Sequence, residues 1–317
     1  MGILLKTRWA VTDFVYDHLP RARKLQRELD EATKIIASLR PKAREVSELQ
    51  QKLSQTGETS APTSNYTGFS SDYPGHQAAI DVFQWTTAMP EGSGLKAGDN
   101  NHFTDTRVMM AAPHIGGFTG KTILELGPYE GYNTAQFERA GAASVIAIEN
   151  NIDNFLKCLV VKNSFGLRST FLLGDMLKYM HLADSRFDIC WASGLLYHMT
   201  DPISLLEGIA RISKSAFIWT HYYDEERAAD KEIGKHLDPS RNKTIVYKDR
   251  SITLHHRNYN HAAGSFFSGG SEPFSYWMSK DDIIFCLNSL GFNRIVSLVD
   301  NPAHPPGAAT FFLAFAD

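Results

Sequence analysis

From residue 121 onward, short apolar runs alternate with segments whose apolar residues recur at helical spacing. Short apolar strands that alternate with helices are typical of a parallel sheet covered on both faces. The pattern therefore predicts an α/β fold for this part of the chain. The expected strands span 122–127, 144–150, 169–175, 187–193 and 215–223, and the expected helices span 132–142, 155–166 and 201–213.

The pattern changes after the fifth expected strand. Two apolar runs at 244–248 and 252–257 flank a turn and predict a hairpin. A helix is expected over 280–290, because Ser279 is a suitable N-cap and Gly291 is suited to ending it. Two last strands are expected at 294–299 and 310–316. Residues 224–278 therefore form an insertion on the substrate side of a domain that spans 121–317.

The N-terminal part has a different hydrophobic pattern, without alternating strands and helices. Residues 1–55 are expected to be mainly one helix, with a seam at heptad spacing and Pro41 inside it. An oligomerising coiled coil and an amphipathic helix folded back on its own domain both fit. A linker at 56–68 and a cap at 69–120, with a helix at 76–87, would follow. The seam consists of Leu25, Leu29, Ala32, Ile36, Leu39, Ala43, Val46 and Leu53.

Composition and charge narrow the class of protein. The chain has 317 residues, of which 43% are hydrophobic and 21% charged, as in soluble globular proteins. A formal net charge of -3 gives no general attraction to nucleic acid, although a local basic patch is compatible with it. We expect no membrane span, because no apolar run approaches the roughly 20 residues required. Three scattered cysteines fit a reducing, cytoplasmic location, and we expect no metal site.

The strongest candidate site begins at the first expected strand. This strand ends in Glu125, and a turn with Gly127, Tyr129 and Gly131 leads into a helix. Ligands of open parallel sheets lie at the carboxyl ends of the strands. The glycines would allow a ligand to approach the backbone, and Glu125 could pair with a cationic ammonium group.

Polar residues end the next three strands as well. Glu149, followed by Asn150, is placed to accept hydrogen bonds from ribose hydroxyls, and Asp175 after Gly174 from an adenine amino group. The fourth strand ends in Ser193, followed by Gly-Leu-Leu-Tyr-His at 194–198. A nicotinamide site is disfavoured, because the turn is not G-x-G-x-x-G.

Residues 121–223 resemble a class I S-adenosylmethionine (SAM) dependent methyltransferase domain. Glu125, Gly127 and Gly131 match the family's D/E-x-G-x-G-x-G, in which Tyr129 here replaces the middle glycine. The resemblance implies SAM as the cofactor and a Rossmann-like sheet of parallel strands with an antiparallel last strand. The segment 194–198 is similar to one in methyltransferases that include the wobble-uridine carboxymethyltransferases of tRNA.

Four residues near the expected methyl group are catalytic candidates: Tyr197, His198, His221 and Tyr222. His198 could act as a general base, or it could be a structural histidine at the start of a helix. The aromatic residues could contact the sulfonium or belong to the core. The hairpin residues Lys248, Arg250, His255, His256 and Arg257 either grip an anionic substrate or form a solvated face.

The leading hypothesis is SAM-dependent methyl transfer to oxygen or nitrogen of a small molecule or glycan precursor. A tRNA-modifying transferase is the alternative among enzymes, and a non-catalytic scaffold is the alternative from another class. We expect residues 224–278 to form a lid over the methyl group, with Gly264, Gly269 and Gly270 as hinges. A homo-oligomer through the N-terminal helix is also expected.

Overall fold

The computed structural model describes residues 73–259 and 272–316, together with Lys34. The chain divides into two compact units, Met1–Thr63 and Ser64–Asp317. The predicted N-terminal helix, apart from Lys34, and the predicted linker lie outside the described residues. So do the three expected hinge glycines of the insertion.

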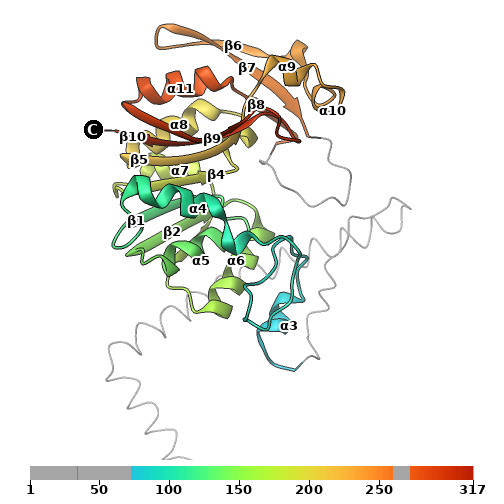
Figure 1. Ribbon diagram of the computed structural model, residues 1–317, viewed down its shortest axis with the longest axis vertical. Helices are drawn as coiled ribbons and strands as arrows, with labels where there is room; N and C mark the ends of the chain where they lie inside the picture. The colour runs from blue at the N-terminus through green and yellow to red at the C-terminus, as the bar shows by residue number, and fades with distance from the viewer. Residues whose placement is uncertain (1–33, 35–72, 260–271, 317) are drawn as a thin grey trace, which may run out of the picture. The chain divides into compact units, whose positions relative to one another are not determined.

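A seven-stranded sheet forms the centre of the second unit (Figure 1), with the order β3-β2-β1-β4-β5-β10-β9. Strands β1 to β5 pair in parallel, whereas β10 is antiparallel to both of its neighbours. The prediction of a parallel Rossmann-like sheet with an antiparallel last strand is confirmed. The strands are β1 (Thr122–Leu126), β2 (Ser144–Glu149), β3 (Thr170–Leu173), β4 (Ile189–Ser193), β5 (Ser215–His221), β9 (Arg294–Asn301) and β10 (Ala309–Phe315).

Helices pack on both faces of this sheet because both carry apolar side chains. One cluster joins α7, α8 and α11 to the sheet through residues such as Met180, Leu206 and Leu287. A second cluster joins α4 and α5 to the other face through Val108 and Phe137, and α6 packs there against β2 and β3. The helices are α4 (Thr106–Ala111), α5 (Tyr132–Arg139), α6 (Ile152–Phe165), α7 (Met176–Leu182), α8 (Pro202–Ile212) and α11 (Lys280–Ser289).

Capping residues explain where several helices begin. The Ser279 hydroxyl accepts a hydrogen bond from the Asp282 amide at 3.1 Å, as expected from the sequence. Asn151 caps α6, which therefore starts earlier than predicted. Helix α7 was not predicted, although Asp175 is its N-cap and Met176 and Met180 recur at helical spacing.

The predicted hairpin is present and belongs to a second sheet (Figure 1), formed by β6 (Lys243–Tyr247), β7 (Arg250–Asn258) and β8 (Phe274–Trp277). Two short helices, α9 (Glu225–Ala228) and α10 (Lys231–Gly234), lie before it in the chain. Ile252 and Leu254 are buried in the same cluster as α7 and α8. The hairpin is therefore anchored in the main core.

The first helix of the cap region is shorter than the predicted helix at 76–87. Helix α3 covers only His76–Ile80. Beyond it, the amides of Thr86 and Thr87 donate to the Glu130 carboxylate at 3.1 and 2.8 Å. These donors are unavailable to a helix, so the helix does not extend to residue 87 as predicted. In the part of the chain that the structure describes, no helix is both long and apolar enough to cross a bilayer.

Candidate functional site

The turn between β1 and α5 has an unusual backbone that brings main-chain atoms to the sheet edge. Gly127, Tyr129 and Gly131 have φ values of 69°, 57° and 76°. Glycine adopts positive φ readily, whereas a tyrosine there is strained. Two contacts of Tyr129 hold it in place: its amide donates to Glu149, and its hydroxyl lies 2.9 Å from the Thr86 hydroxyl.

Glu149 lies at the carboxyl end of β2 and organises the adjoining backbone. Its carboxylate accepts from the amides of Tyr129, Asn150 and Asn151 at 3.1, 2.9 and 2.9 Å. A carboxylate has about four acceptor positions, so roughly one remains for a ligand hydroxyl. Burial raises the pKa of Glu149, while the three backbone hydrogen bonds oppose that shift.

Glu125, near the end of β1, is a second buried carboxyl group of this edge. The Thr134 hydroxyl of α5 donates to it. Burial raises the pKa of Glu125 to about 8; the hydrogen bond from Thr134 opposes the shift, and the charge of Glu149 adds to it. The side chain is therefore largely protonated near neutral pH. A cationic ligand group beside it would favour the ionised form.

The third and fourth strand ends are less saturated with hydrogen bonds. Asp175 uses Oδ1 to cap α7, accepting from the amides of Leu177 and Lys178. Gly174 precedes it with a φ of 155°. The Ser193 hydroxyl at the end of β4 is buried and has no hydrogen-bond partner among the described residues. It is thus an open polar group at the edge where a cofactor is expected.

Two apolar side chains are exposed near these polar groups. Ile152 at the start of α6 is 55% exposed, and Leu173 at the end of β3 is 40% exposed. Ile152 lies three residues after Glu149, and Leu173 lies two residues before Asp175. Apolar surface at this place suits the faces of a planar ring.

Glu130 is a residue of this edge that the sequence interpretation missed. It is fully buried and accepts from the Lys157 ammonium at 2.9 Å, as well as from the Thr86 and Thr87 amides. It therefore ties the cap, the β1–α5 turn and α6 together. The sequence feature that could have identified Glu130 is its position inside the glycine turn, since a buried acidic residue in a packed turn needs partners.

An aromatic cluster lies at the carboxyl end of β5. The His221 ring stacks on Trp277 with centroids 5.4 Å apart and an interplanar angle of 6°. Tyr197 packs edge-on against His221 at 4.6 Å, and Trp219 does so at 5.2 Å. The structure thus brings two predicted candidates, Tyr197 and His221, together with Trp219 and Trp277.

His221 has a defined tautomer, because its Nδ1 lies 2.8 Å from the Gly307 carbonyl oxygen. A carbonyl only accepts, so Nδ1 carries the proton and Nε2 of the neutral ring has the free lone pair. Burial lowers the pKa of His221 to about 4, despite the bond to Gly307. His221 is consequently neutral near pH 7.

His198 and Tyr222 take different positions. The Nδ1 of His198 lies 2.6 Å from the Tyr259 hydroxyl, and burial lowers the pKa of His198 to about 3. These features suit the structural interpretation of His198. The Tyr222 hydroxyl instead donates to Asp300 at 3.0 Å, and its ring belongs to the main core. Strand alternation accounts for this, because Tyr222 points opposite to His221 and Tyr223.

Two buried N–H groups beside the aromatic cluster have no hydrogen-bond partner among the described residues. They are the indole Nε1 of Trp277 and the Nε of Arg257. The Arg257 guanidinium lies 4.9 Å from the Trp277 ring centroid, so the two donors belong to one place. A second cation, Arg107, lies 5.1 Å from the Trp219 ring and pairs with Asp105 at 2.7 Å. Unsatisfied buried donors of this kind suit an oxygen-bearing ligand.

Comparison with known proteins identifies a recognised domain that includes the strand ends of β1–β4. Residues 124–216 match a family model described as a methyltransferase domain. The chain is 30% identical over 108 residues to a tRNA U34 carboxymethyltransferase of Marinobacter nauticus, and 26% identical over 103 residues to one of Alcanivorax borkumensis. The first match covers 34% of this chain and 33% of the relative, and the second 32% of each. The aligned part is thus about a third of the length of these curated relatives.

Solved structures share the fold over a larger part of the chain. The N-terminal domain of EvdMO1 with SAH bound has a TM-score of 0.57 and 21% identity, over 76% of this chain and 95% of that one. The same domain in the presence of SAH and D-fucose has a TM-score of 0.53 and 20% identity, over 87% of this chain and 97% of that one. The predicted methyltransferase fold is confirmed.

Proposed function

We propose that this protein binds SAM at the carboxyl edge of β1–β4 and transfers its methyl group to oxygen or nitrogen of a small molecule or glycan acceptor. The observation that carries the proposal is the pair of buried carboxyl groups, Glu125 and Glu149, around a turn with three positive φ values. The match to a methyltransferase domain over residues 124–216 supports the same assignment.

The residues of the edge fit the parts of this cofactor. Glu125 would face the methionine ammonium group and Glu149 a ribose hydroxyl. Asp175 would accept from the adenine amino group, with Ile152 and Leu173 beside the ring faces. When bound, the cofactor supplies an electrophilic methyl group on a sulfonium.

The acceptor would lie beside the aromatic cluster of Tyr197, His221 and Trp277. The lone pair on His221 Nε2 can take the proton that an acceptor hydroxyl or amine loses, although its low pKa makes it a weak base. The unpaired donors of Trp277 and Arg257 can hold an oxygen of the acceptor and so orient the attacking atom. The solved relative that was studied with SAH and D-fucose supports a sugar-like acceptor.

A second candidate is modification of a tRNA base, which the named sequence relatives favour. Labelled SAM offered to the full chain with a panel of sugars and glycosides, and separately with total tRNA, distinguishes the two. Label in a sugar product supports the first candidate, and label in tRNA supports the second. Calorimetry with SAM, SAH and a nicotinamide dinucleotide tests the cofactor. SAM binding without any transfer would support a scaffold, and binding of the dinucleotide alone would overturn the proposal.

A further inference from the structure

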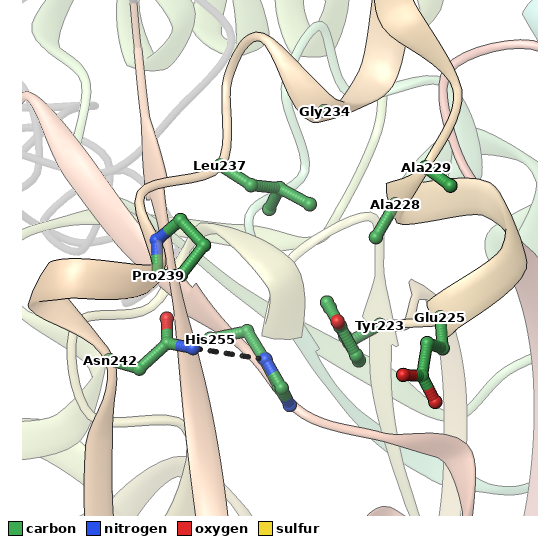
Figure 2. A pocket seen from close by; sticks show the side chains of 9 residues that line it. All are labelled: Tyr223, Glu225, Ala228, Ala229, Gly234, Leu237, Pro239, Asn242 and His255. Atoms are coloured by element: carbon green, nitrogen blue, oxygen red, sulfur yellow. Dashed lines mark hydrogen bonds between the residues drawn. The ribbon is translucent and has the colours of Figure 1, made fainter.

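A cavity of about 290 Å³ lies between Tyr223, just after β5, and the insertion, and none of its lining residues is assigned to the cofactor. Its size is near the lower end of the roughly 300–1,000 Å³ that is usual for small-molecule sites. Figure 2 shows the residues that line it: Tyr223, Glu225, Ala228, Ala229, Gly234, Leu237, Pro239, Asn242 and His255.

The cavity adjoins the aromatic cluster through two parallel ring stacks. Tyr223 stacks on His255 with centroids 3.3 Å apart, just as His221 stacks on Trp277. Tyr223 is two residues after His221, and His255 is paired with Trp277 between β7 and β8. Residues two apart on a strand, and residues directly opposed across an antiparallel pair, point to the same side. A molecule in the cavity is therefore next to the place where the acceptor would react.

The cavity has one polar side and one apolar side. Tyr223, Glu225 and His255 lie along one side, with Leu237 and Ala228 facing them (Figure 2). The side-chain Nδ2 of Asn242 lies 3.4 Å from Nδ1 of His255. Because the amide nitrogen donates, Nδ1 of His255 accepts, and Nε2 of the ring carries the proton. The carboxylate of Glu225 and the hydroxyl of Tyr223 have no hydrogen bond to another described residue. Acceptors and donors are thus both available to a ligand.

The charge of the lining selects against anions. None of the nine lining residues is a lysine or arginine. Burial lowers the pKa of His255 to about 4, so the ring is uncharged near neutral pH. Glu225 is then the single formal charge of the lining, and a phosphate or carboxylate would be repelled. A neutral ligand with hydroxyl donors and a C–H face fits these walls.

We propose that this cavity binds a neutral, monosaccharide-sized ring of the acceptor, with Glu225 accepting from its hydroxyl groups and Leu237 packing against its C–H face. The cavity, as a subsite, would then determine which acceptors bind. That its ligand is part of the acceptor rests on the proposed methyl transfer. The binding itself does not depend on catalysis.

The test uses the full chain and saturation-transfer NMR with D-fucose, D-glucose, glucose 6-phosphate and uridine as probes. We expect both neutral sugars to bind and the phosphate to bind at least about tenfold more weakly. Glu225→Ala should weaken sugar binding about tenfold, as expected for loss of a hydrogen bond to a charged group. Ala228→Leu should weaken it by filling the cavity. Glu226→Gln, a change at the next residue that does not line the cavity, is the matched control.

SAM affinity is measured by calorimetry on the same preparations. Variants that lose sugar binding but keep wild-type SAM affinity are folded and support the subsite. A chain that binds SAM but no neutral sugar, or that prefers uridine or the phosphate, overturns it. A chain that binds the sugars but not SAM keeps the subsite and overturns the proposed function.

Discussion

The edge formed by β1–β4 and the edge formed by β5 with β7–β8 satisfy their polar groups in opposite ways. At the first edge, Glu149 accepts three backbone hydrogen bonds and Glu130 accepts from two amides and an ammonium group. At the second, the N–H donors of Trp277 and Arg257 are buried without a partner among the described residues. The first edge is therefore largely preformed, whereas the second leaves hydrogen-bonding capacity for a ligand.

The two edges also differ in how they shift the pKa values of their side chains. Burial raises the pKa of Glu125 and lowers that of His221, so both groups are mainly neutral near pH 7. Glu125 has no cationic partner among the residues that the structure describes, so a ligand could supply one, whereas His221 keeps a free lone pair. Each edge is thus suited to a different part of one reaction.

The largest expected effect is on the stability of the first edge. Glu130→Ala leaves the Lys157 ammonium and the amides of Thr86 and Thr87 without this buried acceptor. We expect the free energy of unfolding to fall by about 3–5 kcal/mol, as for other broken buried ion pairs. Denaturant unfolding measures it. Glu232→Ala, which breaks an exposed pair with Lys235, should change stability by less than about 1 kcal/mol; equal losses in the two variants would contradict this account.

Glu149→Ala tests cofactor binding at the same edge. It removes the remaining acceptor position and releases the amide of Tyr129, so we expect SAM affinity to fall by about 1–3 kcal/mol. Calorimetry on the wild-type and variant chains measures the change. Glu138→Ala is a control, because this carboxylate also accepts backbone hydrogen bonds but from Arg168 and Ser169, away from the turn. Unchanged SAM affinity in Glu149→Ala would argue against the ribose assignment.

Gly307→Ala tests the second edge. A Cβ atom at residue 307 would be 2.8 Å from the Trp277 ring, and the backbone φ is 132°. We expect a loss of about 1–3 kcal/mol in stability from crowding and a marked loss of methyl transfer as Trp277 shifts. SAM affinity should stay at the wild-type value. Loss of SAM affinity together with activity would show that the two edges are not separable.

The smallest expected effect concerns the protonation of Glu125. The pKa of Glu125 is about 8, so this carboxyl group is protonated near pH 7. If the ammonium group of SAM pairs with the ionised carboxylate, SAM binding near pH 7 should release close to one proton. Affinity should then rise with pH, by at most about tenfold per unit between about pH 6 and 7. Calorimetry in buffers of different ionisation enthalpy counts the proton. Glu125→Gln should abolish the release, and release of a proton by that variant would assign it to another group.

The stability of the unliganded protein should follow the opposite trend. Folded Glu125 keeps its proton up to about pH 8, whereas the unfolded carboxyl group loses it near its ordinary pKa. The folded state therefore binds more protons between these limits, and this group's contribution to stability falls as pH rises through that window.

The sequence predicted the first edge better than the second because the first is local. Glu125, Gly127 and Gly131 lie in one turn, and the carboxyl ends of successive parallel strands meet by topology alone. Trp277, Gly307 and Trp219 come from distant segments, and no spacing in the chain relates them. Tyr222, a candidate near the expected methyl group, contacts Asp300 instead, because alternation along the chain turns it away from the side of His221.

The short helices of the insertion could not be predicted from the sequence either. Helices α9 and α10 have four residues each, too few for periodicity to appear. The cavity that they help to line depends on Tyr223, two residues after β5, stacking against His255 of β7, a contact between segments far apart in the chain. The predicted hairpin, by contrast, followed from alternation within 244–257.

The position of β10 has a consequence for how the protein is made. This strand lies between β5 and β9, yet it follows both in the chain. Until β10 is in place, the far side of β5 stays open and β9 has no neighbour in the described sheet. A nascent chain at this stage presents unpaired, largely apolar strand edges, which are templates for aggregation. Chaperone demand during synthesis should therefore be greatest just before the last strand is inserted.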